Sequence, residues 1–210
     1  MDSEHNSDVE TERFAARKKT AQSKPKKPKK VTAGYLERAA VHYLGRFSSS
    51  EQNLRNVLER KIRRRNENHA PATEEQQGWI SDVVAKCVRY DYVDDNRYAA
   101  QRAEMLLKKG KPVRMIKQDL RHKGISADIS AAAIAQLKGE DTVAIDQKAA
   151  AAYIKRRRFG PFRRETGADD VQMAAKREKE LASMARSGFA YGLATEMLDW
   201  PADDIIDLLA

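Results

Sequence analysis

The sequence predicts an all-α protein, an elongated tandem array of three three-helix repeats preceded by a disordered N-terminal arm. Apolar residues recur at intervals of three and four from Tyr35 onward, and no segment alternates as a strand would. Core positions, and a glycine between two helices, recur after about 64 residues, which aligns Gly124 with Gly188. In such an array each repeat contacts mainly its neighbours, and one long side is available to an extended partner such as a filament or a duplex.

The composition favours this array over one large core. Of the 210 residues, 34% are charged and 7% are aromatic, and the mean hydropathy is −0.74, so a large compact core is disfavoured. The formal net charge of +9 indicates nucleic acid or a negatively charged protein surface as the partner. The same charge can also serve solubility or belong to a tail.

Targeting and redox signals are sparse. No apolar run is long enough to cross a membrane or to form a signal peptide, so we expect a cytoplasmic protein without a membrane partner. The single cysteine, Cys87, excludes an intrachain disulfide framework. It falls at helical spacing with Val83 and Val84, which predicts a small buried core residue.

The predicted arm, residues 1–32, changes from acidic to basic along its length. Carboxylates up to Glu12 give way to a run of cations between Arg13 and Lys30, interrupted by two prolines. This composition is typical of a disordered segment. Nonspecific contacts with phosphates and a purely solubilising role are both open for it.

The first repeat is predicted over residues 33–93. Its first helix has an apolar face made of Leu36, Ala40, Tyr43, Leu44 and Phe47. The serines at 48–50 offer a cap for a second helix, which carries Leu54 and Leu58 and ends in a cluster of cations. We predict a polar loop over residues 66–78 and a third helix that starts at Trp79.

The second repeat is predicted over residues 94–138. Asp94 or Asp95 can cap its first helix, and Gly110 ends that helix. Pro112 then opens the second helix as a first-turn residue. That helix has an apolar stripe of Val113, Ile116 and Leu120, and a cationic stripe of Arg114, Lys117 and Arg121 rotated from it by about 100°. Gly124 ends the second helix and Ser126 can cap the third.

The third repeat is predicted over residues 139–210. Its first helix starts near Thr142 and is broken by the loop over residues 159–164. The second helix ends at Gly188, and Pro201 opens a short final turn after the third. Phe159, in the loop, is flanked by arginines, so it could stack on bases or anchor the loop in the core.

These patterns resemble the RecX family of recombination regulators. The family's second repeat has paired aspartates, an arginine and an aromatic residue, a glycine-proline break, an isoleucine-leucine helix and a lysine-glycine-isoleucine end. The matching residues here are Asp94, Asp95, Arg97, Tyr98, Gly110, Pro112, Ile116, Leu120, Lys123, Gly124 and Ile125. The resemblance extends from about Tyr35 to Leu198, while the long loop after Arg65 and the arm depart from the family pattern.

The resemblance implies a curved array that binds the RecA recombinase. RecX-like proteins lie in the groove of the RecA filament on single-stranded DNA and suppress its ATPase and strand exchange, without an active site of their own. A monomer is expected, and a weak contact with single- or double-stranded DNA is left open. The alternative function is a helical DNA- or RNA-binding module that acts directly on nucleic acid.

The candidate partner- or DNA-binding residues are cations from all three repeats. They are Arg60, Lys61, Arg63, Arg64, Lys108, Lys109, Lys111, Arg114, Lys117, Arg121, Arg156, Arg157, Arg163 and Arg164. Each group can also be an ordinary solvated helix face. That three such groups fall on successive repeats favours a binding role.

No catalytic, cofactor or metal site is predicted. Lys111 is followed by Pro112, so the glycine and lysine there do not make a phosphate-binding loop. The four histidines are scattered without ligand spacing, and a lone cysteine cannot build a zinc knuckle. Asp94 and Asp95 are interpreted as helix caps rather than as an acid/base pair.

Overall fold

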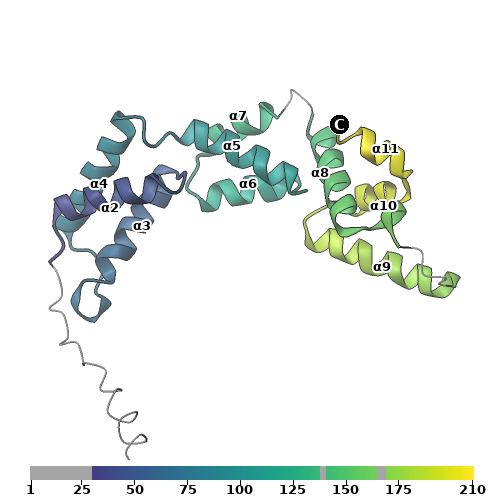
Figure 1. Cartoon of the computed structure of the whole chain (residues 1–210), viewed down its shortest axis with the longest axis horizontal. Helices are drawn as coiled ribbons and strands as arrows, with labels where there is room; N and C mark the ends of the chain where they lie inside the picture. Colours follow the sequence, from purple (N-terminus) through teal and green to yellow (C-terminus); the bar gives the residue numbers. More distant parts are fainter. Residues whose placement is uncertain (1–29, 138–140, 165–168) are drawn as a thin grey trace, which may run out of the picture. The chain divides into compact units, whose positions relative to one another are not determined.

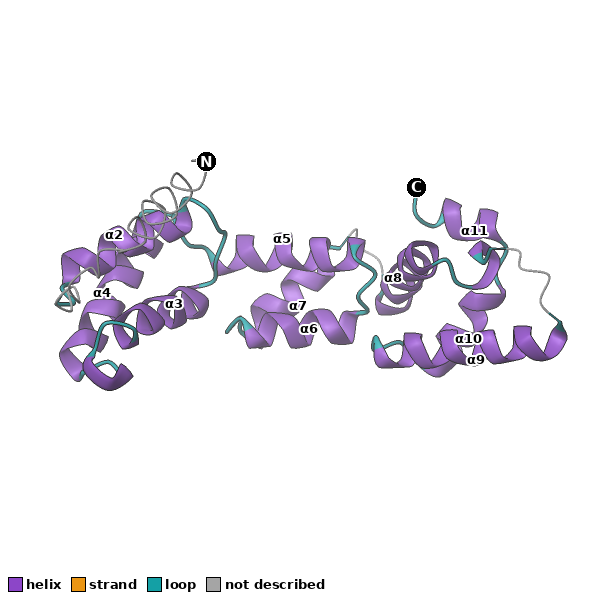
Figure 2. Cartoon of the chain, turned by 60° about the horizontal axis from the view of Figure 1, so that its bottom comes forward, coloured by secondary structure: helices purple, strands orange, loops and turns teal. Residues whose placement is uncertain are grey.

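The computed structural model describes residues 30–137, 141–164 and 169–210 (Figure 1). Within these ranges the chain forms ten α-helices and two short 3-10 turns, and it has no strand (Figure 2). This confirms the all-α prediction. The predicted arm, residues 1–32, lies outside the described residues except for its last three. Of those, Val31 packs on the first core and Thr32 caps the first helix, so both belong to the folded part.

The first three helices pack together around one core. They are α2 (Ala33–Leu44), α3 (Glu51–Arg63) and α4 (Glu74–Arg89). Ser50 caps α3, as predicted, by accepting from the N–H of Asn53. Phe47, predicted on the first helix, instead lies beyond its end with 51% of its surface exposed, and its ring contacts the Tyr43 ring at a tilt of 37°.

The polar loop predicted over residues 66–78 is too long. Helix α4 already begins at Glu74, because Thr73 and Gln76 form a capping box in which each side chain accepts from the other's backbone N–H. Gly78 therefore lies inside the helix, where a glycine costs stability but does not end the helix. The actual connection contains a 3-10 turn at Glu67–His69.

The remaining helices form two further groups. The second group is α5 (Asp95–Lys108), α6 (Val113–His122) and α7 (Ala127–Ala135). The third is α8 (Thr142–Arg157), α9 (Asp170–Arg186), α10 (Tyr191–Asp199) and the short α11 (Ala202–Asp207). We call the three groups repeats 1, 2 and 3. Their division at residues 33–93, 94–138 and 139–210 remains a proposal.

Each repeat has its own hydrophobic cluster, and the clusters of repeats 2 and 3 meet. Leu107 packs against the clusters of both repeat 2 and repeat 3. Ile145, on α8, belongs to the cluster of repeat 2. The 64-residue alignment holds in the core: Leu120 and Met184 are both fully buried, and Gly124 and Gly188 both have positive φ.

Helix-end contacts join repeat 1 to repeat 2. The carboxylate of Asp95 accepts a hydrogen bond from the N–H of Glu51, the first residue of α3, at 2.9 Å. The hydroxyl of Ser50 donates to the carbonyl of Lys123, just past the end of α6. Gly124 packs against Gln52, so close that a Cβ atom on the glycine would lie 2.2 Å from the Gln52 Cβ. The start of α3 is thus seated on the end of α6.

The same joint recurs between repeats 2 and 3. Asp146, on α8, accepts from the N–H of Val113, the first residue of α6. Gly188, just past the end of α9, packs against Met115 on α6, as Gly124 packs against Gln52. We call the two contacts the inter-repeat joints. Pro112 is the residue before α6 and not its first residue, a shift of one position from the prediction.

Candidate partner-binding surface

The cationic stripe of α6 is exposed along its length. Arg114, Lys117 and Arg121 are all exposed, and none has an ion-pair partner among the described residues. The neighbouring apolar stripe of the same helix, about 100° around the axis, is buried in the core of repeat 2. Because the core fixes this side of the helix, the three cations are held in a row beside it.

The cations of α3 crowd its last turn. Arg60, Arg63 and Arg64 are exposed, and Lys61 is half-buried. Here they complement the negative end of the helix dipole. The neighbouring Arg65 has a different place: its guanidinium lies 3.6 Å from the centre of the Tyr35 ring, a cation–π contact within repeat 1.

The three lysines at the end of α5 differ in their surroundings. Lys108 forms an ion pair with Glu104 at 2.7 Å. The ammonium of Lys109 lies near the sulfur of Met105, and Lys111 is half-buried. This group therefore presents less free positive charge than its sequence indicates.

One candidate binding residue of repeat 3, Arg163, is paired inside the fold. Arg163 makes two hydrogen bonds to the carboxylate of Glu180, at 2.7 and 2.6 Å, and Glu180 is buried. Hydrogen bonding to Glu180 raises the pKa of Arg163 further above its ordinary value. The charge of Arg163 is therefore neutralised by Glu180 within the fold, whereas Arg164 is exposed.

The two arginines at the end of α8 lie over aromatic rings. Arg156 lies 5.5 Å from the centre of the Tyr153 ring and donates to the carbonyl of Lys109 in repeat 2. Arg157 lies 5.6 Å from the centre of the Phe159 ring. Phe159 packs against the core of repeat 3, which favours its role as a loop anchor over stacking on bases.

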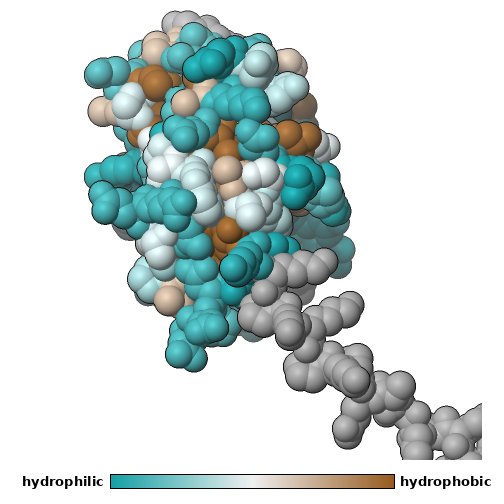
Figure 3. Space-filling view, turned by 90° about the vertical axis from the view of Figure 1, so that its left-hand side faces the viewer, coloured by the Kyte–Doolittle hydropathy of each residue, from teal (hydrophilic) through white to brown (hydrophobic). Residues whose placement is uncertain are grey.

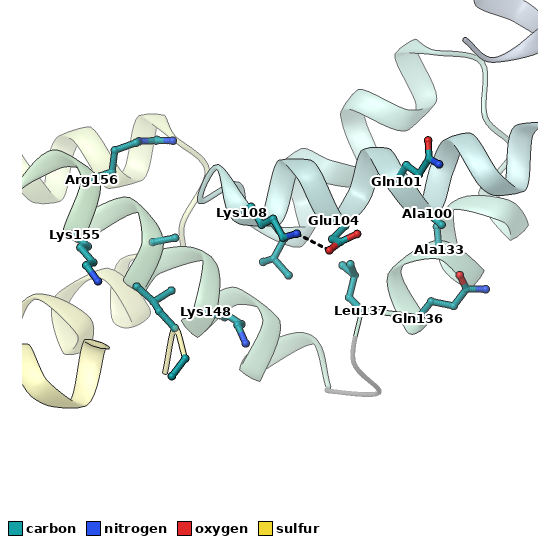
Figure 4. Close-up of a pocket in the computed structure, with 14 residues that line it drawn as sticks. Ala100, Gln101, Glu104, Lys108, Ala133, Gln136, Leu137, Lys148, Lys155 and Arg156 are labelled. Atoms are coloured by element: carbon teal, nitrogen blue, oxygen red, sulfur yellow. Dashed lines mark ion pairs between the residues drawn. The ribbon is translucent and has the colours of Figure 1, made fainter. Parts of the chain in front are cut away.

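A groove between repeats 2 and 3 was not predicted from the sequence. It has a volume of about 830 Å³ and is lined by α5, α7, α8 and the last two residues. Figure 4 shows Lys148, Lys155 and Arg156 on the α8 side and Gln101 and Glu104 on the α5 side. Four segments distant in sequence build it, so no local spacing could have found it.

An ion pair between α5 and α6, also not predicted from the sequence, supports the helix that carries the cationic stripe. Arg102, on α5, donates two hydrogen bonds to the carboxylate of Asp119 on α6, at 2.8 and 2.9 Å. Hydrogen bonding to Arg102 lowers the pKa of Asp119. Because Asp119 lies on the same helix as Lys117 and Arg121, this pair helps to hold that helix in place.

The paired aspartates cap two different helices. Asp94 caps α5 by accepting from the N–H groups of Asn96 and Arg97, while Asp95 caps α3 of the preceding repeat. Burial raises the pKa of Asp95. Arg97 pairs mainly with Asp91, at 3.1 Å, and more distantly with Asp94.

Repeat 1 carries several exposed apolar side chains. Val41, Phe47, Tyr90 and Tyr92 are more than half exposed, and Val88 is less so. The face in Figure 3 is largely hydrophilic, with separate hydrophobic residues rather than one continuous patch. In the described ranges, no cluster of three or more histidine, cysteine or acidic residues could hold a metal, and no helix there could span a membrane.

The fold and its surfaces define a protein of tandem three-helix repeats joined end to end through helix caps. The family model for the second three-helix domain of RecX matches residues 94–134. The regulatory protein RecX of Myxococcus xanthus is 35% identical over 83% of this chain and 90% of its own length. That of Agrobacterium fabrum is 26% identical over 84% of this chain and 88% of its own length.

Solved structures share the fold. The crystal structure of RecX from Lactobacillus salivarius has a TM-score of 0.50 at 20% identity, covering 84% of this chain and 96% of that one. A second crystal structure, of a regulatory protein RecX, has a TM-score of 0.55 at 19% identity, covering 80% and 73%. The chain belongs to the RecX family of regulatory proteins.

Proposed function

We propose that this protein binds the filament that the RecA recombinase forms on single-stranded DNA, and that it inhibits the ATPase and strand-exchange activities of that filament. In this proposal the protein is a non-enzymatic regulator that acts as a monomer in the cytoplasm. The observation that carries it is the row of exposed cations Arg114, Lys117 and Arg121, which lies within the segment matched by the RecX model.

The mechanism follows from binding one filament state more tightly than others. An array of repeats can contact several subunits of a repeating partner, because each repeat presents its own helix faces. If the contacts are better in one arrangement of subunits, the equilibrium shifts toward it by the difference in binding free energy. ATP turnover and strand exchange, which need the filament to pass through other arrangements, then slow down.

The test is the DNA-dependent ATPase of the recombinase from the same organism, measured with increasing amounts of this protein at low and moderate salt. We expect inhibition at both, weaker at higher salt because part of the attraction is electrostatic. Unchanged ATPase at both salt concentrations would refute the proposal.

Direct binding to nucleic acid is a second candidate, favoured by the net charge of +9 and by the exposed cations of α6. A protein that acts this way binds DNA without the recombinase, with an affinity that falls steeply as salt rises. Gel-shift titrations of single- and double-stranded DNA, with and without recombinase, separate the two functions.

A further inference from the structure

The groove between repeats 2 and 3 combines an apolar lining with a cationic rim. Leu107 from α5, Leu137 after α7 and Leu209 near the end of the chain contribute large apolar side chains. Lys148 and Lys155 lie along α8, seven residues apart, so they share one face of that helix. Small residues leave the space between these groups open.

The described residues that line the groove carry more positive than negative charge. Four of these side chains are cationic, and one, Glu104, is a carboxylate. Glu104 pairs with Lys108 (Figure 4). Lys148 and Lys155 have no ion-pair partner in the described part of the chain. The α8 side therefore presents positive charge to whatever enters.

We infer that this groove docks an acidic, amphipathic segment of the recombinase, an inference that rests on the proposed function. Apolar side chains of the segment contact Leu107, Leu137 and Leu209, and its carboxylates face Lys148 and Lys155. The phosphates of a nucleic-acid backbone could contact the lysines, but the backbone has no apolar groups to pack against the leucines. A polypeptide can supply both carboxylates and apolar side chains, so it fits the groove better.

The groove would let two repeats contact one partner. Its α5 and α7 walls belong to repeat 2, its α8 wall belongs to repeat 3, and Arg156 bridges the two by donating to the carbonyl of Lys109. A segment seated there contacts both repeats at once. The cations raise the rate of encounter and the apolar contacts slow dissociation.

The first experiment changes the cationic rim and the apolar interior of the groove separately. The double variant Lys148→Glu/Lys155→Glu reverses the free charge, and Ala152→Trp fills the groove without changing charge. We expect each to weaken binding to the recombinase filament by about tenfold or more, the charge variant losing its effect at high salt. The matched control is Arg38→Glu/Lys179→Glu, two exposed cations away from the groove, with the same change in net charge.

Folding and the underlying function are checked alongside. Circular dichroism and thermal unfolding show whether each variant keeps its helices. If the wild-type protein does not inhibit the recombinase, the proposed function fails; if it does, and both groove variants bind as the control does, only the docking inference fails.

The second experiment identifies the occupant. A photo-crosslinking amino acid replaces Gln101, at the groove, and in a control Gln172, an exposed residue of α9. Mass spectrometry of the irradiated complex is expected to find an acidic recombinase peptide attached at position 101 and not at 172. Crosslinking at 101 to DNA, to residues 1–29 of this chain or to a second copy, or no crosslinking, would overturn the inference.

Discussion

The carboxylate of Asp146 accepts a hydrogen bond from the backbone N–H of Val113 at 2.7 Å, so a side chain of repeat 3 caps a helix of repeat 2. Helix α6 needs this external cap because Pro112, the residue before it, has no side-chain oxygen to accept from its free N–H groups. Asp95 binds the N–H of Glu51 in the same way at the start of α3, where Ser50 of the same repeat also caps the helix. In both joints an aspartate of one repeat thus binds the first N–H of the middle helix of the preceding repeat.

Removing the Asp146 cap should destabilise the joint between repeats 2 and 3. We expect Asp146→Ala to lower the free energy of unfolding by about 1 kcal/mol, the usual cost of losing a helix cap. Urea denaturation followed by circular dichroism measures it. Asp82→Ala, at an exposed position of α4, is the control and should stay within about 0.5 kcal/mol of wild type. Equal effects of the two substitutions would mean that the Asp146 contact adds nothing.

The Arg102–Asp119 pair should make stability depend on acid pH. Hydrogen bonding to Arg102 lowers the pKa of Asp119 in the folded state below its ordinary value of 3.8. Its stabilising contribution is therefore present above pH 3.8 and is lost as the pH falls through the lower, folded-state pKa.

We expect Asp119→Asn to lower the free energy of unfolding by about 1–2 kcal/mol at neutral pH, since it removes a charged, two-bond contact. The difference from wild type should shrink as the pH is lowered below the ordinary aspartate range. Denaturation curves at a series of pH values test this, and a difference that grows toward acid pH would contradict it.

Two glycine-to-alanine substitutions should change the free energy of unfolding in opposite directions. Gly124 has φ +77°, and an added Cβ would overlap Gln52 in the first inter-repeat joint. We expect Gly124→Ala to lower the free energy of unfolding by more than about 1 kcal/mol. Gly78 lies inside α4 with nothing within 4 Å of an added Cβ, so Gly78→Ala should raise it by about 0.5–1 kcal/mol. Thermal unfolding of the two variants compares them directly.

Reversing the α6 stripe should reduce inhibition without unfolding the protein. We expect the triple variant Arg114→Glu/Lys117→Glu/Arg121→Glu to require roughly tenfold more protein for half-inhibition of the recombinase ATPase, with unchanged helicity. The control, which carries the same number of reversals, is the triple variant Arg38→Glu/Arg89→Glu/Lys179→Glu. Normal inhibition by the first variant would show that the stripe is only a solvated face.

Much of the fold could be predicted because local signals coincide. At Gly124 a glycine follows a cationic last turn and precedes a serine cap, and the structure has a positive φ there. The sequence predicts the start of α4 five residues late, because the apolar pattern begins only at Trp79, whereas the capping box that starts the helix is polar. Helix periodicity does not register such a start.

Contacts across repeats could not be predicted. Asp94 and Asp95 are chemically alike and adjacent, yet only the three-dimensional structure shows that Asp95 caps a helix of another repeat. Arg163 belongs to a cationic run, and its partner Glu180 lies 17 residues away on the next helix, so the run gives no hint of the pair. The groove at Lys148 needs four distant segments together.

The inter-repeat joints also indicate where chains of this kind could be spliced. Each joint uses a backbone N–H at a helix start, one aspartate and one glycine, and it leaves the outward faces of α3 and α6 out of the contact. A chimaera could exchange one whole repeat for its counterpart from a relative, with the joint aspartate and glycine at the same positions. It would keep the inter-repeat joints while gaining new outward-facing side chains. The residues that select the partner could therefore change without a change in the fold.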